Sequence, residues 1–240
     1  MTRYSRLALI VVGAAGALPG PLLAQHVGGA LPADLQEKVQ RVEAGVRNRP
    51  KDAPPPVGIV LAMHRFQASM AAGRPEEAKA AIDSALERVE GKADPYDQKL
   101  RKVLAGIKKL QESGEKAMIL SLTMSQLGPR VEAGDENGVD ETLGLALRLA
   151  AGVDPRKEKA ALPFVRFAEK MKKVQELLPA WKAAGGEESK IADTAGRAGK
   201  LVESGKLAEA EAALDQGLAV LDSKDKPSAP APGDEGRESK

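Results

Sequence analysis

The chain of 240 residues has a formal net charge of +2 and no cysteine, which excludes disulfides, thiolate metal sites and thiol nucleophiles. Aromatic residues make up only 2% of it, and many of its apolar residues are Ala, a composition that favours close helix packing over a β-sheet. Arg3 and Arg6 lie in a predicted leader, so the remaining chain has a charge near zero, which argues against a surface for nucleic acid.

The first predicted element is a secretory signal peptide. A basic start precedes an uncharged apolar run from Leu7 to Leu18, and Leu22-Leu23-Ala24 places a small residue at the expected cleavage site. The apolar run is shorter than the roughly 20 residues that a membrane-spanning helix needs. We therefore expect cleavage between Ala24 and Gln25, no membrane insertion afterwards, and a periplasmic or secreted protein with an N-terminal lead over 25–33.

Three segments with recurring glycine and apolar positions define repeat 1 (34–91), repeat 2 (95–152) and repeat 3 (166–223). Repeats 1 and 3 match at an offset of 132 residues, and repeat 2 follows repeat 1 at an offset of 61 with a weaker match. Each repeat is predicted to contain three helices, so the expected fold is all-α, with three degenerate units stacked as a helical-repeat body. The recurring positions are Gly73, Ala78, Ile82, Leu86, Gly134, Leu143, Leu147, Gly205, Ala210, Leu214 and Leu218.

Repeat 1 shows the helical pattern most clearly. Apolar residues at helical spacing from Leu35 to Val46 predict its first helix, and the proline-containing segment 48–56 predicts a loop. The second helix is predicted to begin near Val57. Gly73 then supplies a left-handed turn, and Pro75 lies in the first turn of the third helix.

The glycine-turn hairpin from Val57 to Glu90 resembles a tetratricopeptide-type helical hairpin. The residues that carry this resemblance are Gly73, Ala78, Ile82, Ala85 and Leu86, with Gly134, Val139, Leu143, Ala146 and Leu147, and Gly205, Ala210, Leu214, Gly217 and Leu218. The aromatic positions and the closing proline of that family are missing, and an extra helix lengthens each repeat. The Glu-Ala…Leu-Asp…Ala-Leu phrase also resembles helical segments of exported bacterial proteins. The resemblance covers about half of each repeat and implies a helical-repeat fold that binds proteins.

Prolines interrupt the pattern at four further places. Pro129 falls within the expected second helix of repeat 2, which predicts a kink or an early end near Leu127-Gly128. Asp-Pro occurs in both spacers, Ala93–Pro95 and Val153–Pro155. The tail over 224–240 combines prolines with mixed charges and is predicted to be disordered.

Few residues suggest chemistry. His64 lies at the edge of an apolar helix face, where a structural histidine is the simpler interpretation and a metal ligand or proton shuttle the alternative. The methionines recur at apolar positions, which favours a core over a copper site. The segment Thr194–Leu201 is similar to a phosphate loop but lacks its first glycine and its closing hydroxyl, and its apolar spacing fits a helix. We therefore expect no catalytic residue, no cofactor and no metal.

The few aromatic residues are more often part of a core than of a contact surface, and Trp181 is the one with the strongest case for contacting a partner instead. It follows Pro179 near the end of a predicted helix, and an exposed indole at such a place anchors many interfaces. Together with His64 it forms the set of expected partner contacts. The sequence thus predicts an interaction or scaffolding protein of the cell envelope that binds another envelope protein. The alternative is a periplasmic small-ligand or metal-binding helical protein, and an enzyme is not expected.

Overall fold

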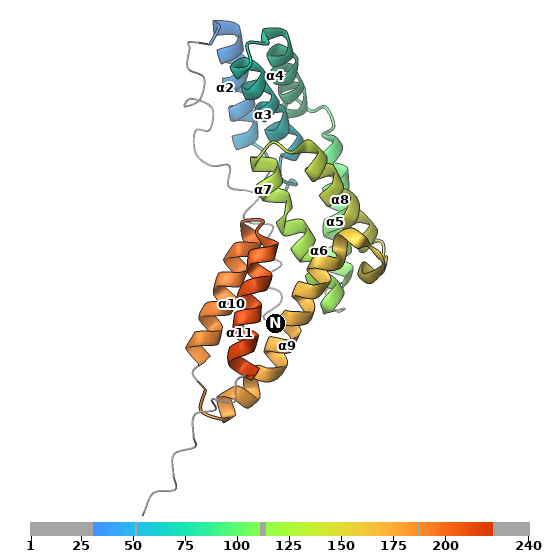
Figure 1. Cartoon of the computed structure of the whole chain (residues 1–240). Helices are drawn as coiled ribbons and strands as arrows, with labels where there is room; N and C mark the ends of the chain where they lie inside the picture. Colours follow the sequence, from blue (N-terminus) through green and yellow to red (C-terminus); the bar gives the residue numbers. More distant parts are fainter. Residues whose placement is uncertain (1–30, 51, 111–113, 187, 223–240) are drawn as a thin grey trace, which may run out of the picture. The chain divides into compact units, whose positions relative to one another are not determined.

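The computed structural model describes residues 31–50, 52–110, 114–186 and 188–222, and within these ranges the chain is helical and has no strand (Figure 1). The all-α prediction is therefore confirmed. The chain divides into two compact units, Met1–Ala161 and Leu162–Lys240, called here the N-terminal unit and the C-terminal unit. The predicted leader, the Ala24–Gln25 cleavage site and the tail over 224–240 lie outside the described residues.

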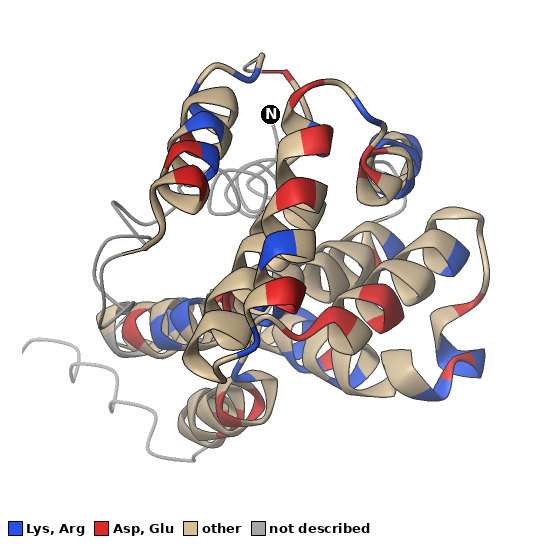
Figure 2. Cartoon of the chain, turned by 90° about the horizontal axis from the view of Figure 1, so that it is seen from above, with Lys and Arg blue, Asp and Glu red and all other residues tan. Residues whose placement is uncertain are grey.

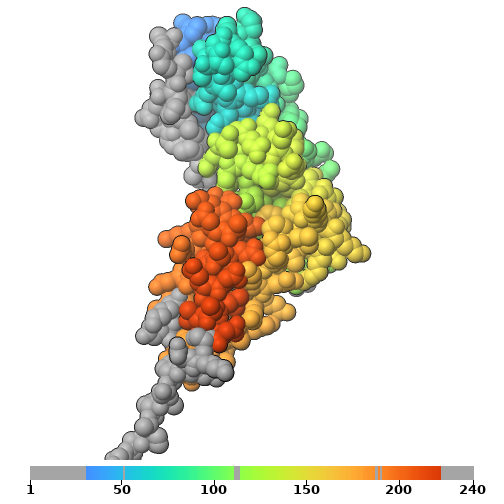
Figure 3. Space-filling model, in the orientation of Figure 1, coloured from blue at the N-terminus to red at the C-terminus, as the bar shows by residue number. Residues whose placement is uncertain are grey.

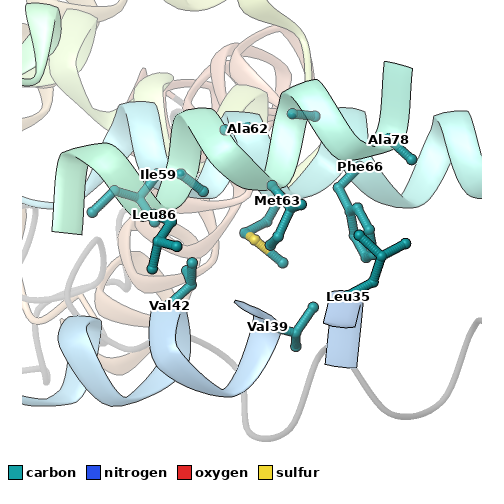
Figure 4. Packing of buried hydrophobic residues seen from close by; sticks show 12 residues of the cluster. Leu35, Val39, Val42, Ile59, Ala62, Met63, Phe66, Ala78 and Leu86 are labelled. Atoms are coloured by element: carbon teal, nitrogen blue, oxygen red, sulfur yellow. The ribbon is translucent and has the colours of Figure 1, made fainter. Parts of the chain in front are cut away.

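Repeat 1 consists of α2 (Ala33–Arg47), α3 (Val57–Ala71) and α4 (Pro75–Val89). The last helix packs against both of the others. One apolar face of each helix contributes to a shared core, which includes the large side chain of Phe66 (Figure 4). The buried members of this core are Leu35, Val39, Val42, Ile59, Ala62, Met63, Phe66, Ala78, Ala81, Ile82, Ala85 and Leu86.

Repeat 2 is built from α5 (Pro95–Leu110), α6 (Glu115–Ser125), α7 (Leu127–Glu132) and α8 (Glu136–Ala150), and α8 packs against the other three. The helices α6 and α7 occupy the segment for which the sequence predicts a single helix. The interruption lies at Gln126. Pro129 explains it, because proline has no N–H to donate to the carbonyl of Ser125 and its ring crowds that carbonyl. The predicted early end of this helix is confirmed.

Two short 3-10 turns, η2 (Pro155–Lys157) and η3 (Lys159–Ala161), follow α8. Repeat 3 then consists of α9 (Leu162–Ala183), α10 (Glu188–Glu203) and α11 (Leu207–Asp222). Again the last helix packs against both of the others. With α6 and α7 counted as one interrupted helix, all three repeats share one plan, in which the third helix lies against the first and the second.

The turn before the last helix has the same geometry in every repeat. Gly73, Gly134 and Gly205 adopt left-handed φ angles of 67°, 68° and 75°. At the first turn, the N–H of Gly73 donates to the carbonyl of Met70 at 3.0 Å, and the next N–H donates to the carbonyl of Ser69 at 2.9 Å. The same two bonds recur at the other two glycines. This pattern is the Schellman motif, which closes a helix on a residue without a Cβ.

A lysine of the first helix forms an ion pair with the third helix in each repeat. These lysines occupy the equivalent positions 38, 99 and 170. Such half-exposed pairs contribute at most about 1 kcal/mol each, so they orient the helices more than they stabilise them. The pairs are Lys38–Asp83, Lys99–Asp140 at 2.8 Å, Lys170–Glu211 at 3.0 Å and Lys170–Asp215 at 2.7 Å.

The helix α3 is apolar on two opposite faces. Ile59 and Phe66 face the core of repeat 1, whereas Val57 and Leu61 are buried but lie outside that core. Helical geometry places these two residues and His64 on the opposite side of α3. Because α3 also contacts α5 and α7, this second face is covered by repeat 2, and the space-filling view shows the two repeats in close contact (Figure 3).

Polar contacts also join repeats 1 and 2 within the N-terminal unit. The buried carboxylate of Asp94 accepts hydrogen bonds from the N–H of Gly58 at 3.1 Å and from the N–H of Tyr96 at 2.9 Å. It therefore ties the beginning of α3 to the beginning of α5. Arg49, in the loop after α2, pairs with Asp97 of α5 at 3.1 Å.

Candidate functional site

His64 lies at the joint between repeats 1 and 2, on the second buried face of α3. A Cβ placed on Gly134 would be 3.1 Å from the Cβ of His64, so the histidine packs against the turn that precedes α8. Burial lowers the pKa of the imidazole below its usual range, and the carboxylate of Glu132 partly opposes this shift. The side chain is half-buried, and its role as a partner contact stays a prediction.

Charged and aromatic side chains from three helices accompany His64 at this joint. Arg65 of α3 forms an ion pair with Glu136 of α8. Burial raises the pKa of the Tyr96 phenol, and the carboxylates of Asp140 and Glu136 raise it further. The ammonium of Lys99 lies 5.4 Å from the centre of the Tyr96 ring, within the range of a cation–π contact. The Arg65–Glu136 ion pair joins the two repeats, whereas the Lys99–Tyr96 contact lies within α5.

Trp181 lies near the end of α9 in the C-terminal unit. Its ring packs against the apolar cluster of Val174, Ile191 and Leu218, and a Cβ on Gly186 would collide with the indole. The indole N–H is buried and has no hydrogen-bond acceptor among the described residues. Trp181 is therefore a half-buried member of the repeat 3 core. That it anchors a partner stays a prediction.

The remaining displaced pKa values among the described residues belong to an ion-pair network between α9 and α11. Burial alone would lower the pKa of Lys170, but hydrogen bonds to Asp215 and Glu211 outweigh it and raise that pKa. Burial alone would raise the pKa of Glu211, yet its hydrogen bonds with Lys170 and Arg166 hold that pKa below its usual range. This network is the repeat 3 form of the lysine ion pair that each repeat contains.

The apolar residues among the predicted repeat positions lie in the helix interfaces, whereas the three glycines form the turns. Leu147 is the exception, because it is half-buried while Leu145 and Leu149 on the other side of α8 are buried. Its counterparts Leu86 and Leu218 are buried. The other apolar repeat positions are buried as well: Ala78, Ile82, Leu143, Ala210 and Leu214.

The segments weighed for ligand chemistry lie in helices. Thr194–Leu201 belongs to α10. Met63 and Met124 are buried, whereas Met70, Met118 and Met171 are half-buried. Within the described ranges no three or more His, Asp or Glu side chains are grouped as metal ligands. No helix in the described part of the chain is long and apolar enough to cross a membrane.

One charged surface was not predicted from the sequence, because the Lys and Arg residues were interpreted as solvated side chains balanced by acids. Figure 2 shows this mixture on most helices. On α5, however, Arg101, Lys102, Lys108 and Lys109 are all exposed and form no ion pair with a described residue. The segment from 101 to 109 contains four cations and no acid, a signal that was present in the sequence.

His64 and Trp181 belong to different compact units, so each is a separate candidate for a partner contact.

Comparison with known proteins identifies no relative of this chain. A scan against protein-family models finds no matching family, and searches of curated proteins and of solved structures find no significant match.

Proposed function

We propose that this chain is an exported, tetratricopeptide-like interaction or scaffolding protein of the cell envelope that catalyses no reaction. The observation that carries the proposal is the repeated three-helix plan, with its glycine turn and its ion pair from the first helix to the third. Repeats that share such a plan present extended helical surfaces, and proteins built in this way commonly bind other proteins.

The displaced pKa values support the same proposal. Those of His64 and Tyr96 arise at the joint between two repeats, and those of Lys170 and Glu211 arise in an ion-pair network between helices. Each shift therefore has a structural cause. In an enzyme, displaced pKa values more often converge on one cleft.

Export is the part of the proposal that is easiest to test. If the leader is cleaved between Ala24 and Gln25, the intact mass of the exported protein equals that of a chain beginning at Gln25. A mass that still includes residues 1–24 would contradict this prediction.

The interaction itself is tested by crosslinking in the native envelope. The tagged full chain is crosslinked through its lysines, purified under denaturing conditions and analysed by mass spectrometry, while native mass spectrometry is applied to a sample that was not crosslinked. We expect crosslinks from exposed helix positions to one envelope protein in a fixed stoichiometry. A monomer that carries a stoichiometric metal or metabolite, without a protein partner, would instead support a ligand-binding protein.

A further inference from the structure

The exposed face of α5 carries a row of four cations. Arg101 and Lys102 are followed seven residues later by Lys108 and Lys109, so the two pairs lie about 10 Å apart along one side of the helix. Ala105 is exposed between them on the same face. No described acidic residue pairs with any of the four, and Glu112, the nearest acid in the sequence, lies outside the described residues.

The equivalent positions in repeats 1 and 3 show what is unusual here. Arg41 and Lys173 correspond to Lys102, and both are paired with an acid just beyond or at the end of the third helix. Repeat 2 has Ala151 at the position of that acid. The partners are Glu90 for Arg41 and Asp222 for Lys173, the latter at 3.1 Å.

At a second position, repeat 2 again lacks the acid that pairs with the equivalent cation in repeat 1. Arg47 of α2 pairs with Glu43 one turn earlier at 3.7 Å. In repeat 2 the equivalent residues are Lys108 and Leu104, so the cation is present and its acidic partner is not. Lys102 thus corresponds to a cation that both sister repeats pair internally, and Lys108 to one that repeat 1 pairs. In repeat 2 these charges are not compensated by a described residue, which leaves a positive potential along α5.

We propose that this face of α5 binds an acidic helical segment of a partner protein. The inference rests on the proposed interaction function and specifies the surface and the chemistry of the partner. A row one helix wide, with cation pairs seven residues apart, matches a helix of about 10–12 Å diameter that carries acids at heptad spacing. The small side chain of Ala105 allows such a helix to approach closely.

A flat or extended polyanion fits this surface less well. The neighbouring helix α8 carries the exposed acids Asp140 and Glu141, which are paired with Lys99 and Arg130. A membrane surface or a nucleic acid that reached beyond α5 would meet these ion pairs, which add no net positive charge to attract it. A single acidic helix contacts the cations alone, so charge complementarity favours a protein segment.

The first test uses a labelled helical peptide with glutamates at positions i, i+1, i+7 and i+8, titrated with the full mature chain. We expect K102E/K109E to weaken the affinity at least about tenfold, because two attractive contacts become repulsive. The control K157E/K159E changes the net charge equally at exposed cations of η2 and η3 and is expected to change the affinity less than about twofold. Far-ultraviolet spectra check that both variants fold. Equal affinities of both variants would overturn the inference, as would tighter binding of anionic vesicles or duplex DNA than of the peptide.

The second test places a photo-crosslinking amino acid at position 105 of the full chain in the native envelope. A crosslinked partner that is lost in K102E/K109E and kept in K157E/K159E supports the inference. If lysine crosslinking still recovers a stoichiometric partner while position 105 captures nothing, the inference fails and the proposed function stands. If no partner is recovered from any position, the proposed function fails, and the peptide titration alone decides whether α5 binds acidic helices.

Discussion

The second helices of repeats 1 and 3 are both apolar on the inner face, which packs into the core of their own repeat. They differ in polarity on the outer face, on the other side of the helix. On the inner face, Ile59 and Phe66 of α3 correspond to Ile191 and Ala198 of α10, and all four are buried. On the outer face the residues differ in kind: Val57, Leu61 and His64 of α3 correspond to Ser189, Asp193 and Gly196 of α10. The α3 residues are buried or half-buried by repeat 2, and the α10 residues are exposed.

This difference separates two functions of one helix. The inner face provides the core of its own repeat, and it is apolar wherever a repeat folds. The outer face determines whether the repeat must pack against another one. The α3 helix, with apolar residues on both faces, requires a neighbour, because an exposed apolar stripe is unfavourable in water. The α10 helix has a polar outer face that is stable in contact with water.

The largest expected effect comes from giving α3 the outer-face residue of α10. Leu61 is only 1% exposed, so Leu61→Asp buries an unpaired charge and is expected to cost more than about 3 kcal/mol. The reciprocal change Asp193→Leu, at an exposed position, is expected to alter stability by less than about 0.5 kcal/mol. Urea unfolding followed by far-ultraviolet circular dichroism measures both. Similar losses for the two variants would show that the outer faces do not differ as described.

The next effect uses equivalent core positions in the two compact units. Leu143 and Leu214 are both fully buried, so each change to alanine is expected to cost about 2–5 kcal/mol through a cavity. The sequence contains one tryptophan, Trp181, and its fluorescence therefore reports on the C-terminal unit. We expect Leu214→Ala to shift the fluorescence transition and Leu143→Ala to shift only the circular dichroism signal. A fluorescence shift in Leu143→Ala would mean that the two units unfold together.

A smaller effect compares two turns of the same geometry. Gly73→Ala and Gly134→Ala both place a Cβ on a left-handed residue, which costs about 1–2 kcal/mol. The Cβ on Gly73 meets open space, whereas the Cβ on Gly134 meets His64 at 3.1 Å. Thermal unfolding is therefore expected to show a larger loss for Gly134→Ala. Equal melting temperatures would indicate that the joint adjusts freely at this contact.

The smallest effect concerns the pH dependence of the joint. Because the folded-state pKa of His64 is lowered, folding favours the neutral imidazole, and its contribution to stability is complete above about pH 6.5. That contribution is lost as the pH falls through the lower folded-state pKa. We expect His64→Gln to flatten the decrease in melting temperature between about pH 7 and pH 5. Glu132→Gln removes the opposing carboxylate and is expected to steepen it. An unchanged profile in both variants would contradict this account.

Local sequence signals predicted most of the fold. Helical spacing located the core face of α2, glycine marked the turns at positions 73, 134 and 205, and Pro129 marked the interruption between α6 and α7. Each of these signals acts within one or two helical turns. They depend on backbone geometry and on hydrogen bonding that neighbours in the sequence determine.

Features that depend on distant parts of the chain were not predicted. The second buried face of α3 was missed, because Val57 and Leu61 are apolar residues whose burial depends on the position of repeat 2. Whether the indole of Trp181 packs in a core or anchors a partner was left open, because the cluster on which it packs includes Leu218 from another helix. The cations of α5 differ from those of the sister repeats in having no ion-pair partner among the described residues, a difference that depends on which acids the fold brings close. Their sequence signal, four cations without an acid, was overlooked.

A close contact between the first and third helices of repeats 1 and 2 has an evolutionary consequence. In repeat 1 a Cβ on Gly45 would collide with Val89, and in repeat 2 a Cβ on Gly106 would collide with Ala150. Repeat 3 has Leu177 and Leu221 at the same two positions, both packed at the edge of its apolar cluster. The first helix therefore carries a glycine where the side chain of the third helix lies against its backbone, and a leucine where both side chains join the apolar cluster. In related chains the two positions should covary, because a large residue in place of the glycine would collide with the third helix unless its partner changes as well.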